Sequence, residues 1–140
     1  MTPPLSTSRL RVRYADTDQM GVVYYANYLV WFEVARTDLL RHAGWTYKDM
    51  EAAGFSLPVV AAHCEYRQPA RYDDMVDVDA SGSLLSPVRV RFDYRVVRTE
   101  GTVLLAEGHT IHASLDAAGR PRRLPERARG IFARAAGDAS

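Results

Sequence analysis

The sequence predicts an α+β protein, in which an antiparallel sheet carries its helices on one side. Two observations lead to this class. A single long apolar helix is predicted over residues 27–44, near the amino terminus, and a series of strand patterns joined by short turns follows it. With 140 residues, the chain is expected to form one domain, with its core between about residue 9 and residue 125.

The first strand and the helix are recognised by their periodicity. Residues 9–14 alternate charged and apolar side chains, which is the pattern of a half-buried strand. Asn27 is expected to cap the helix, because its side-chain oxygen can accept a hydrogen bond from an N–H one turn further on, and Gly44 is placed to end it. The first two turns are apolar almost all round. This predicts an enclosed helix. The aromatic residues Tyr24, Tyr28, Trp31 and Phe32 are expected to belong to the core.

The second half of the chain is predicted to be mostly strand. A short helix over residues 46–53 comes first, and four strand patterns follow, over residues 57–69, 75–85, 88–97 and 103–115. Turns are expected at residues 99–102 and 116–121. A last helix, over residues 125–134, has proline in its first turn, and residues 133–140 are small and polar enough to fray.

Composition narrows the possible functions. The net charge is +1, which argues against a nucleic-acid partner bound through bulk charge. No apolar run is long enough to insert into a membrane. The single cysteine, Cys64, cannot form an intramolecular disulfide, and no signal-peptide core precedes it, so a cytoplasmic location is expected. No histidine spacing indicates a metal site, and no cofactor is expected.

Residues 13–27 carry the pattern most indicative of chemistry. Asp18 stands between the first strand and the helix, and Gly21 follows, where a residue without Cβ lets the backbone turn sharply. The first N–H groups of a helix have no partner inside it and, with the helix dipole, favour an anion or a polarised carbonyl oxygen. A carboxylate beside such donors can serve acyl transfer, either by direct attack or by activating water.

The motif Asp16-Thr17-Asp18-x-x-Gly21-Val22-Val23-Tyr24-Tyr25-x-Asn27-Tyr28 resembles that of the hotdog-fold acyl-CoA thioesterases of the 4-hydroxybenzoyl-CoA thioesterase type. The resemblance extends from about residue 10 to residue 125, through residues 66–70 and 73–74. It implies a hotdog fold, a curved antiparallel sheet of about five strands wrapped around one long central helix. It also implies hydrolysis of an acyl-CoA to a free acid and coenzyme A, so that coenzyme A is part of the substrate.

The resemblance assigns roles to individual residues. Asp18 takes the position of the catalytic carboxylate, and Tyr25 takes that of the residue whose backbone N–H binds the thioester oxygen, although a sister branch has histidine there. Asp16 and Thr17 are expected to hold the turn. Arginine forks bind phosphate well, which makes arginines near strand ends candidates for coenzyme A binding. The predicted substrate-binding residues are Gly21, Val22, Val23, Tyr24, Asn27, His63, Arg89 and Arg91.

The resemblance also predicts a homodimer or homotetramer, because hotdog proteins commonly pair two sheets and bind acyl-CoA between subunits. Two alternatives stay open at this point: a hotdog protein that binds acyl-CoA without hydrolysing it, and a thioesterase that acts on acyl carrier protein. Hydratase chemistry is disfavoured, since it usually needs an Asp–His pair and the nearest histidine after Asp18 is His42. The acyl group and the choice between attack and general-base catalysis by Asp18 are left undecided.

Overall fold

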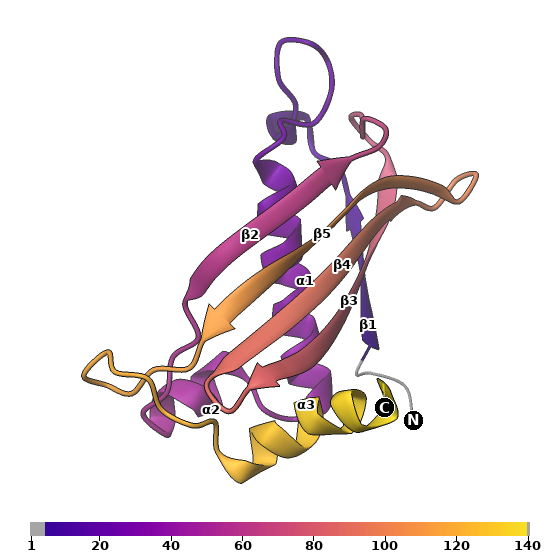
Figure 1. Ribbon diagram of the computed structural model, residues 1–140. Helices are drawn as coiled ribbons and strands as arrows, with labels where there is room; N and C mark the ends of the chain where they lie inside the picture. Colours follow the sequence, from indigo (N-terminus) through magenta and orange to yellow (C-terminus); the bar gives the residue numbers. More distant parts are fainter. Residues whose placement is uncertain (1–4, 140) are drawn as a thin grey trace.

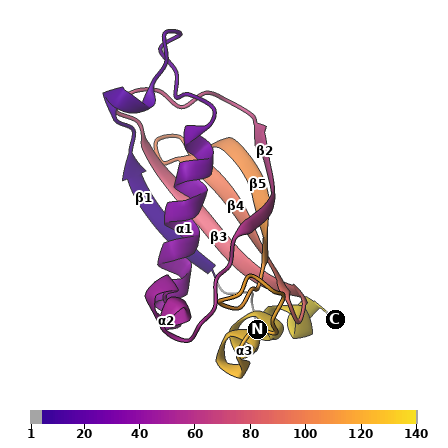
Figure 2. The same ribbon diagram turned by 90° about the vertical axis from the view of Figure 1, so that its left-hand side faces the viewer.

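The computed structural model describes residues 5–139, and side chains as far as residue 132 (Figure 1). Its elements in chain order are β1 (Leu5–Arg11), a 3-10 turn (Tyr14–Asp16), α1 (Asn27–Ala43), α2 (Tyr47–Ala52), β2 (Val59–Tyr66), β3 (Met75–Ser86), β4 (Arg89–Arg98), β5 (Val103–Ala113) and α3 (Glu126–Ala139). The strands form one antiparallel sheet in the order β1-β3-β4-β5-β2. The sheet curves around α1, which lies against one face (Figure 2). The predicted α+β hotdog arrangement is confirmed.

The core lies between α1 and the inner face of the sheet. Phe32 of α1 stacks on Tyr94 of β4, with ring centroids 4.2 Å apart and an angle of 4° between the planes. Buried valines of β3 and β4 belong to the same core. Complete burial of a side chain of this size contributes about 2–3 kcal/mol, so this apolar contact helps to hold the helix against the sheet.

The first strand differs from its prediction. It begins at Leu5 and ends at Arg11, and Tyr14 turns outward in the 3-10 turn. The inward positions Ser6 and Ser8 are polar, which is why alternation of apolar residues did not reveal them. Their hydroxyls bond to side chains of α1: Ser6 Oγ lies 2.9 Å from His42 Nδ1, and Ser8 Oγ donates to Asp38 Oδ2 at 2.6 Å.

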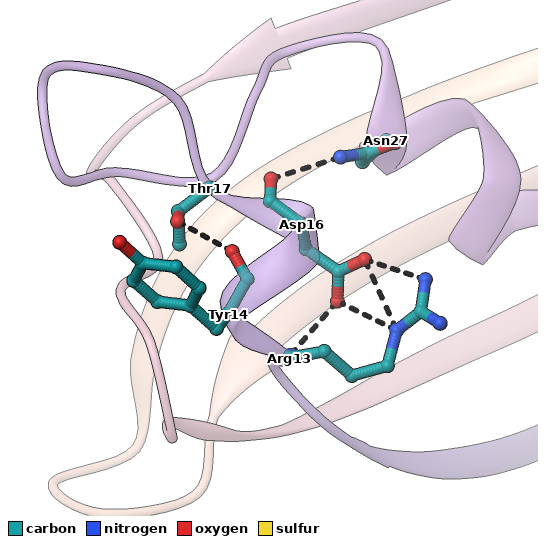
Figure 3. Close-up of polar contacts among 5 residues, drawn as sticks. All are labelled: Arg13, Tyr14, Asp16, Thr17 and Asn27. Atoms are coloured by element: carbon teal, nitrogen blue, oxygen red, sulfur yellow. Dashed lines mark hydrogen bonds and ion pairs between the residues drawn. The ribbon is translucent and has the colours of Figure 1, made fainter.

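The ends of α1 give one confirmed and one wrong prediction. Gly44 ends the helix in the left-handed conformation, with φ of +85°, and Trp45 N–H donates to Leu40 O at 3.0 Å. Asn27 is not the cap: Ala26 occupies that position, and the Asn27 side chain donates to the carbonyl of Asp16 at 2.9 Å (Figure 3). Asn27 is itself the first residue of the helix, and its side-chain nitrogen directs the side chain to the loop that precedes α1.

Within a single chain, α1 is only partly enclosed. Tyr28, Trp31 and Phe32 are buried as predicted, but Leu29 and Val30 are 40% and 53% exposed. Tyr24, predicted to be in the core, is also exposed. The prediction was wrong for Leu29 and Val30 because the sheet of one chain covers only one side of α1, and for Tyr24 because it lies in the loop before α1.

The chain ends with α3, which is longer than predicted. It continues to Ala139, beyond the predicted end at residue 134, and the fraying expected from residue 133 stays a prediction. Phe132 packs edge-on against Phe92 of β4, with centroids 5.8 Å apart, and anchors the helix to the sheet. Residues 1–4 and residue 140, part of the predicted tails, lie outside the described residues. Within residues 5–139, no helix is both long and apolar enough to cross a membrane.

Candidate active site

The segment between the 3-10 turn and α1 is a tight loop fastened to the rest of the chain. Asp18 N–H donates to Val22 O at 2.9 Å, and Gly21 N–H donates to Asp18 O at 3.0 Å. Gly21 has φ of +80°, a conformation that costs an L-residue with a side chain about 1–2 kcal/mol. Val23 N–H donates to Ala70 O at 2.9 Å, which ties the loop to the segment after β2.

Asp16 anchors the base of this loop (Figure 3). Its carboxylate, which is buried, accepts hydrogen bonds from the backbone N–H of Arg13 at 2.8 Å and from the Arg13 guanidinium at 2.9 Å. Burial alone would raise the pKa of Asp16, but these hydrogen bonds and the charge of Arg13 hold it below its ordinary value. Thr17 Oγ1 donates to Tyr14 O at 2.6 Å. Asp16 and Thr17 therefore hold the turn, as predicted.

Asp18 is half-buried and uses only one of its carboxylate oxygens within the chain. Its Oδ1 accepts a hydrogen bond from the backbone N–H of Met20 at 2.8 Å, which fixes the side chain across the turn. Among the described residues, Oδ2 accepts no hydrogen bond. The carboxylate is thus oriented by the loop and keeps one oxygen available for a reactant.

The start of α1 presents free backbone donors. Asn27 N–H donates to Tyr24 O at 2.9 Å and Tyr28 N–H to Tyr25 O at 3.3 Å. None of the described residues accepts a hydrogen bond from the N–H of Tyr25 or of Ala26. These two donors stand at the positive end of the helix dipole, where they can bind a carbonyl oxygen or an oxyanion.

Asp18 and Tyr25 line the same cavity, which has a volume of about 290 Å³. Apolar and aromatic side chains form most of its wall, and Asp18 is the only carboxylate among its described lining residues. Residues that follow β2 also line it. The lining residues are Asp18, Val22, Val23, Tyr25, Tyr28, Tyr66, Arg67, Gln68 and Pro69.

Sequence reasoning did not assign Tyr66, Arg67 or Gln68 to the site, although all three line this cavity. They come about fifty residues after Asp18 in the chain and reach it only because β2 ends beside the start of α1. Tyr66 also bonds to the helix directly, since its hydroxyl donates to Tyr25 O at 2.9 Å. The one available signal was the match of residues 66–70 to the family pattern.

The structure separates the other predicted binding residues from this cavity. His63 and Arg91 line a second hollow, of about 490 Å³, which the outward-facing residues of the sheet form. There the His63 ring stacks on that of His109 with centroids 5.5 Å apart, and Arg91 forms an ion pair with Asp93 at 2.9 Å. Arg89 begins β4, at the end of the sheet opposite the Asp18 loop (Figure 1).

Three predicted binding residues lie close to the cavity without lining it. Gly21 is at the exposed tip of the loop, Tyr24 is exposed, and Asn27 bonds to the backbone of Asp16. Of the predicted residues, Asp18, Tyr25, Val22 and Val23 are therefore brought together. The catalytic and substrate-binding roles of all the predicted residues stay predictions.

The fold and this cavity, at the start of a central helix, define a hotdog protein with the features of a thioesterase. Residues 12–132 match the thioesterase-like superfamily, and the chain belongs to that superfamily. The crystal structure of Slr0204, a 1,4-dihydroxy-2-naphthoyl-CoA thioesterase from Synechocystis, is similar with a TM-score of 0.86 and 26% identity, over 92% of this chain and 96% of that one.

Two relatives are similar in sequence. The acyl-CoA thioester hydrolase YbgC of Escherichia coli is 36% identical over 118 residues, which cover 84% of this chain and 87% of YbgC. YneP of Bacillus subtilis is 50% identical over 70 residues, so the matched part of the chain spans only 51% of the length of YneP.

Proposed function

We propose that the protein is an acyl-CoA thioesterase, which hydrolyses the thioester to a free acid and coenzyme A. Thioester hydrolysis is the activity for which its superfamily is named, and both YbgC and Slr0204 are named for acyl-CoA substrates. The observation that carries the proposal is the pairing of Asp18 with Tyr25. One largely apolar cavity is lined by a carboxylate and by a helix-terminal residue; one oxygen of the former and the N–H of the latter have no hydrogen-bond partner among the described residues.

The backbone of Tyr25 supplies the electrophilic part of the mechanism. The thioester carbonyl oxygen accepts a hydrogen bond from the Tyr25 N–H, and the dipole of α1 stabilises the negative charge that grows on this oxygen. One such donor contributes about 3 kcal/mol to the stability of a tetrahedral intermediate. Because the donor is a main-chain group, the phenol of Tyr25 is not needed for this step.

Asp18 supplies the nucleophilic part by one of two routes. In the first, its free oxygen attacks the carbonyl carbon, the C–S bond breaks and coenzyme A leaves as a thiolate. Water then hydrolyses the resulting mixed anhydride and restores the carboxylate. In the second, Asp18 accepts a proton from a water molecule that attacks the same carbon directly. A single turnover in ¹⁸O-labelled water distinguishes them when water attacks the Asp18 carbonyl of the anhydride, because the label then enters the Asp18 carboxylate, which the second route never labels.

The proposed assembly is a homodimer formed along β2, with a homotetramer as the larger form. β2 is an edge strand, paired on one side only with β5, and its exposed residues include Val59 and Val60. Such an edge offers unpaired backbone groups to a second chain. Since β2 ends at Tyr66, in the wall of the cavity, a partner strand there would lie beside the site.

The test is thiol release from a panel of acyl-CoA esters with aromatic and aliphatic acyl groups, alongside the same acyl groups carried on acyl carrier protein. Hydrolysis of coenzyme A esters is the expected result, and the panel ranks the acyl groups. Hydrolysis of the carrier-protein thioesters alone would mean that the substrate is an acyl carrier protein ester and not an acyl-CoA. Thermal stabilisation by acyl-CoA without any thiol release would contradict hydrolysis and favour a binding protein.

A further inference from the structure

Tyr66, the last residue of β2, connects the edge strand to the start of α1. Its hydroxyl donates a hydrogen bond to the carbonyl oxygen of Tyr25 at 2.9 Å. Its ring packs edge-on against Tyr28, with centroids 5.0 Å apart, and against Tyr25, with centroids 6.4 Å apart. The hydroxyl therefore has a fixed direction, and its acceptor is the residue proposed to bind the thioester oxygen.

The hydrogen bonds around Tyr25 determine where its N–H points. A peptide group is planar, so a residue is oriented once the groups before and after it are both held. The preceding group is held through Tyr24 O, which accepts from Asn27 N–H at 2.9 Å. The following group is held through Tyr25 O, whose helical bond from Tyr28 N–H is long, at 3.3 Å, whereas the bond from Tyr66 is 2.9 Å. The Tyr66 hydroxyl thus provides the shorter of the two restraints on that side.

The hydrogen bond from the Tyr66 hydroxyl also affects the N–H of Ala26. Tyr25 C=O and Ala26 N–H belong to one peptide group, and a hydrogen bond accepted by the carbonyl polarises the group and strengthens its N–H as a donor. The hydroxyl is also able to donate across the neutral pH range. Partial burial raises the pKa of Tyr66 well above its ordinary value, and the nearby Cys64 thiol raises it further.

We infer that Tyr66 is a positioning residue for thioester hydrolysis: its hydroxyl holds the first turn of α1 so that the Tyr25 N–H meets the substrate carbonyl. This inference rests on the proposed function. The relevant variant is Tyr66→Phe, which removes the hydroxyl and keeps the ring contacts with Tyr28 and Tyr25. A matched control is Tyr72→Phe, because Tyr72 is exposed and its hydroxyl makes no hydrogen bond to any described residue.

Steady-state thiol release and an amide ¹H–¹⁵N spectrum test the inference together. In Tyr66→Phe we expect kcat to fall about tenfold, the effect of one lost hydrogen bond at the transition state, with KM changed less than about twofold. The Ala26 amide resonance should move upfield, because the carbonyl of its peptide group loses a donor. Tyr72→Phe should leave kcat, KM and the Ala26 resonance unchanged.

Other results would overturn the inference. An unchanged kcat in Tyr66→Phe, alongside an Asp18→Asn variant that is inactive, would reject the role of Tyr66 and leave the proposed function in place. A raised KM with unchanged kcat would mean that Tyr66 binds substrate instead of positioning Tyr25. An unmoved Ala26 resonance would remove the structural basis of the inference. If the wild-type protein released no thiol, the proposed function would fail and this role of Tyr66 with it.

Discussion

Replacing Asp16 with alanine should loosen the loop that carries Asp18. The Asp16 carboxylate is buried and accepts hydrogen bonds from the Arg13 backbone at 2.8 Å and from the Arg13 guanidinium at 2.9 Å. A hydrogen bond to a charged group contributes about 1.5–3 kcal/mol. The Arg13 side chain is 76% exposed, so solvent weakens the contribution of its guanidinium. We therefore expect Asp16→Ala to lower the free energy of unfolding by about 2 kcal/mol in total. The carbonyl of Asp16, which Asn27 and Tyr24 use, remains in the variant.

Urea unfolding at neutral and acidic pH measures this effect. Since the pKa of Asp16 is lowered in the folded protein, its contribution is present above the ordinary carboxyl pKa and is lost as pH falls through the lowered value. The stabilities of wild type and Asp16→Ala should therefore converge in strong acid. Asp79→Ala serves as control, because its carboxylate accepts an exposed bond from Thr7 on the sheet, away from the loop. Equal losses in the two variants at pH 7 would refute the reasoning.

Three further predictions concern the site and the core. Gly21→Ala should lower stability by about 1–2 kcal/mol, because φ is +80° there, yet still fold, as its new Cβ meets no atom within 4 Å; urea unfolding measures the loss. Tyr25→Phe should keep kcat within roughly twofold of wild type, and a loss of hundredfold would show that the phenol takes part. Burial holds the pKa of His112 at about 4, below its ordinary 6.5, so the unfolded chain takes up a proton first on acidification. Stability should fall by up to about 3 kcal/mol between these pH values, and the fall should be smaller in His112→Gln.

The sequence predicted those helices, strands and turns that depend only on residues close together in the chain. Residues 88–97, whose side chains alternate, form β4. Gly44 ends α1 as predicted, because its left-handed conformation depends only on the last turn of the helix. Asn27 is not the cap because α1 begins one residue earlier than predicted, so that Ala26 is the cap and Asn27 the first helical residue, whose side-chain N–H donates to Asp16 O. Leu29 and Val30 are exposed, although their apolar pattern predicts burial. Such a pattern shows that a side chain favours burial, but it does not show whether the sheet of the same chain or the surface of another chain covers it.

The candidate site was predictable only where it follows the motif. Asp18 and Tyr25 are seven residues apart and meet through one loop, so the family pattern was enough to pair them. Tyr66 joins them through the packing of β2 against α1, which no periodicity reveals. Arg91 fits a phosphate ligand by residue type, but it lies two residues from Asp93 on one strand face and forms an ion pair there.

The most direct test of the account compares thiol release by wild type, Asp18→Asn and a control, Glu51→Gln. Asparagine keeps the acceptor for Met20 N–H and removes the charge, so the loop should remain folded. Glu51 is an exposed carboxylate of α2, at the end of the molecule opposite the loop (Figure 1). The account predicts a kcat reduced at least about a hundredfold in Asp18→Asn, with Glu51→Gln unchanged. Wild-type turnover in a folded Asp18→Asn variant would contradict it.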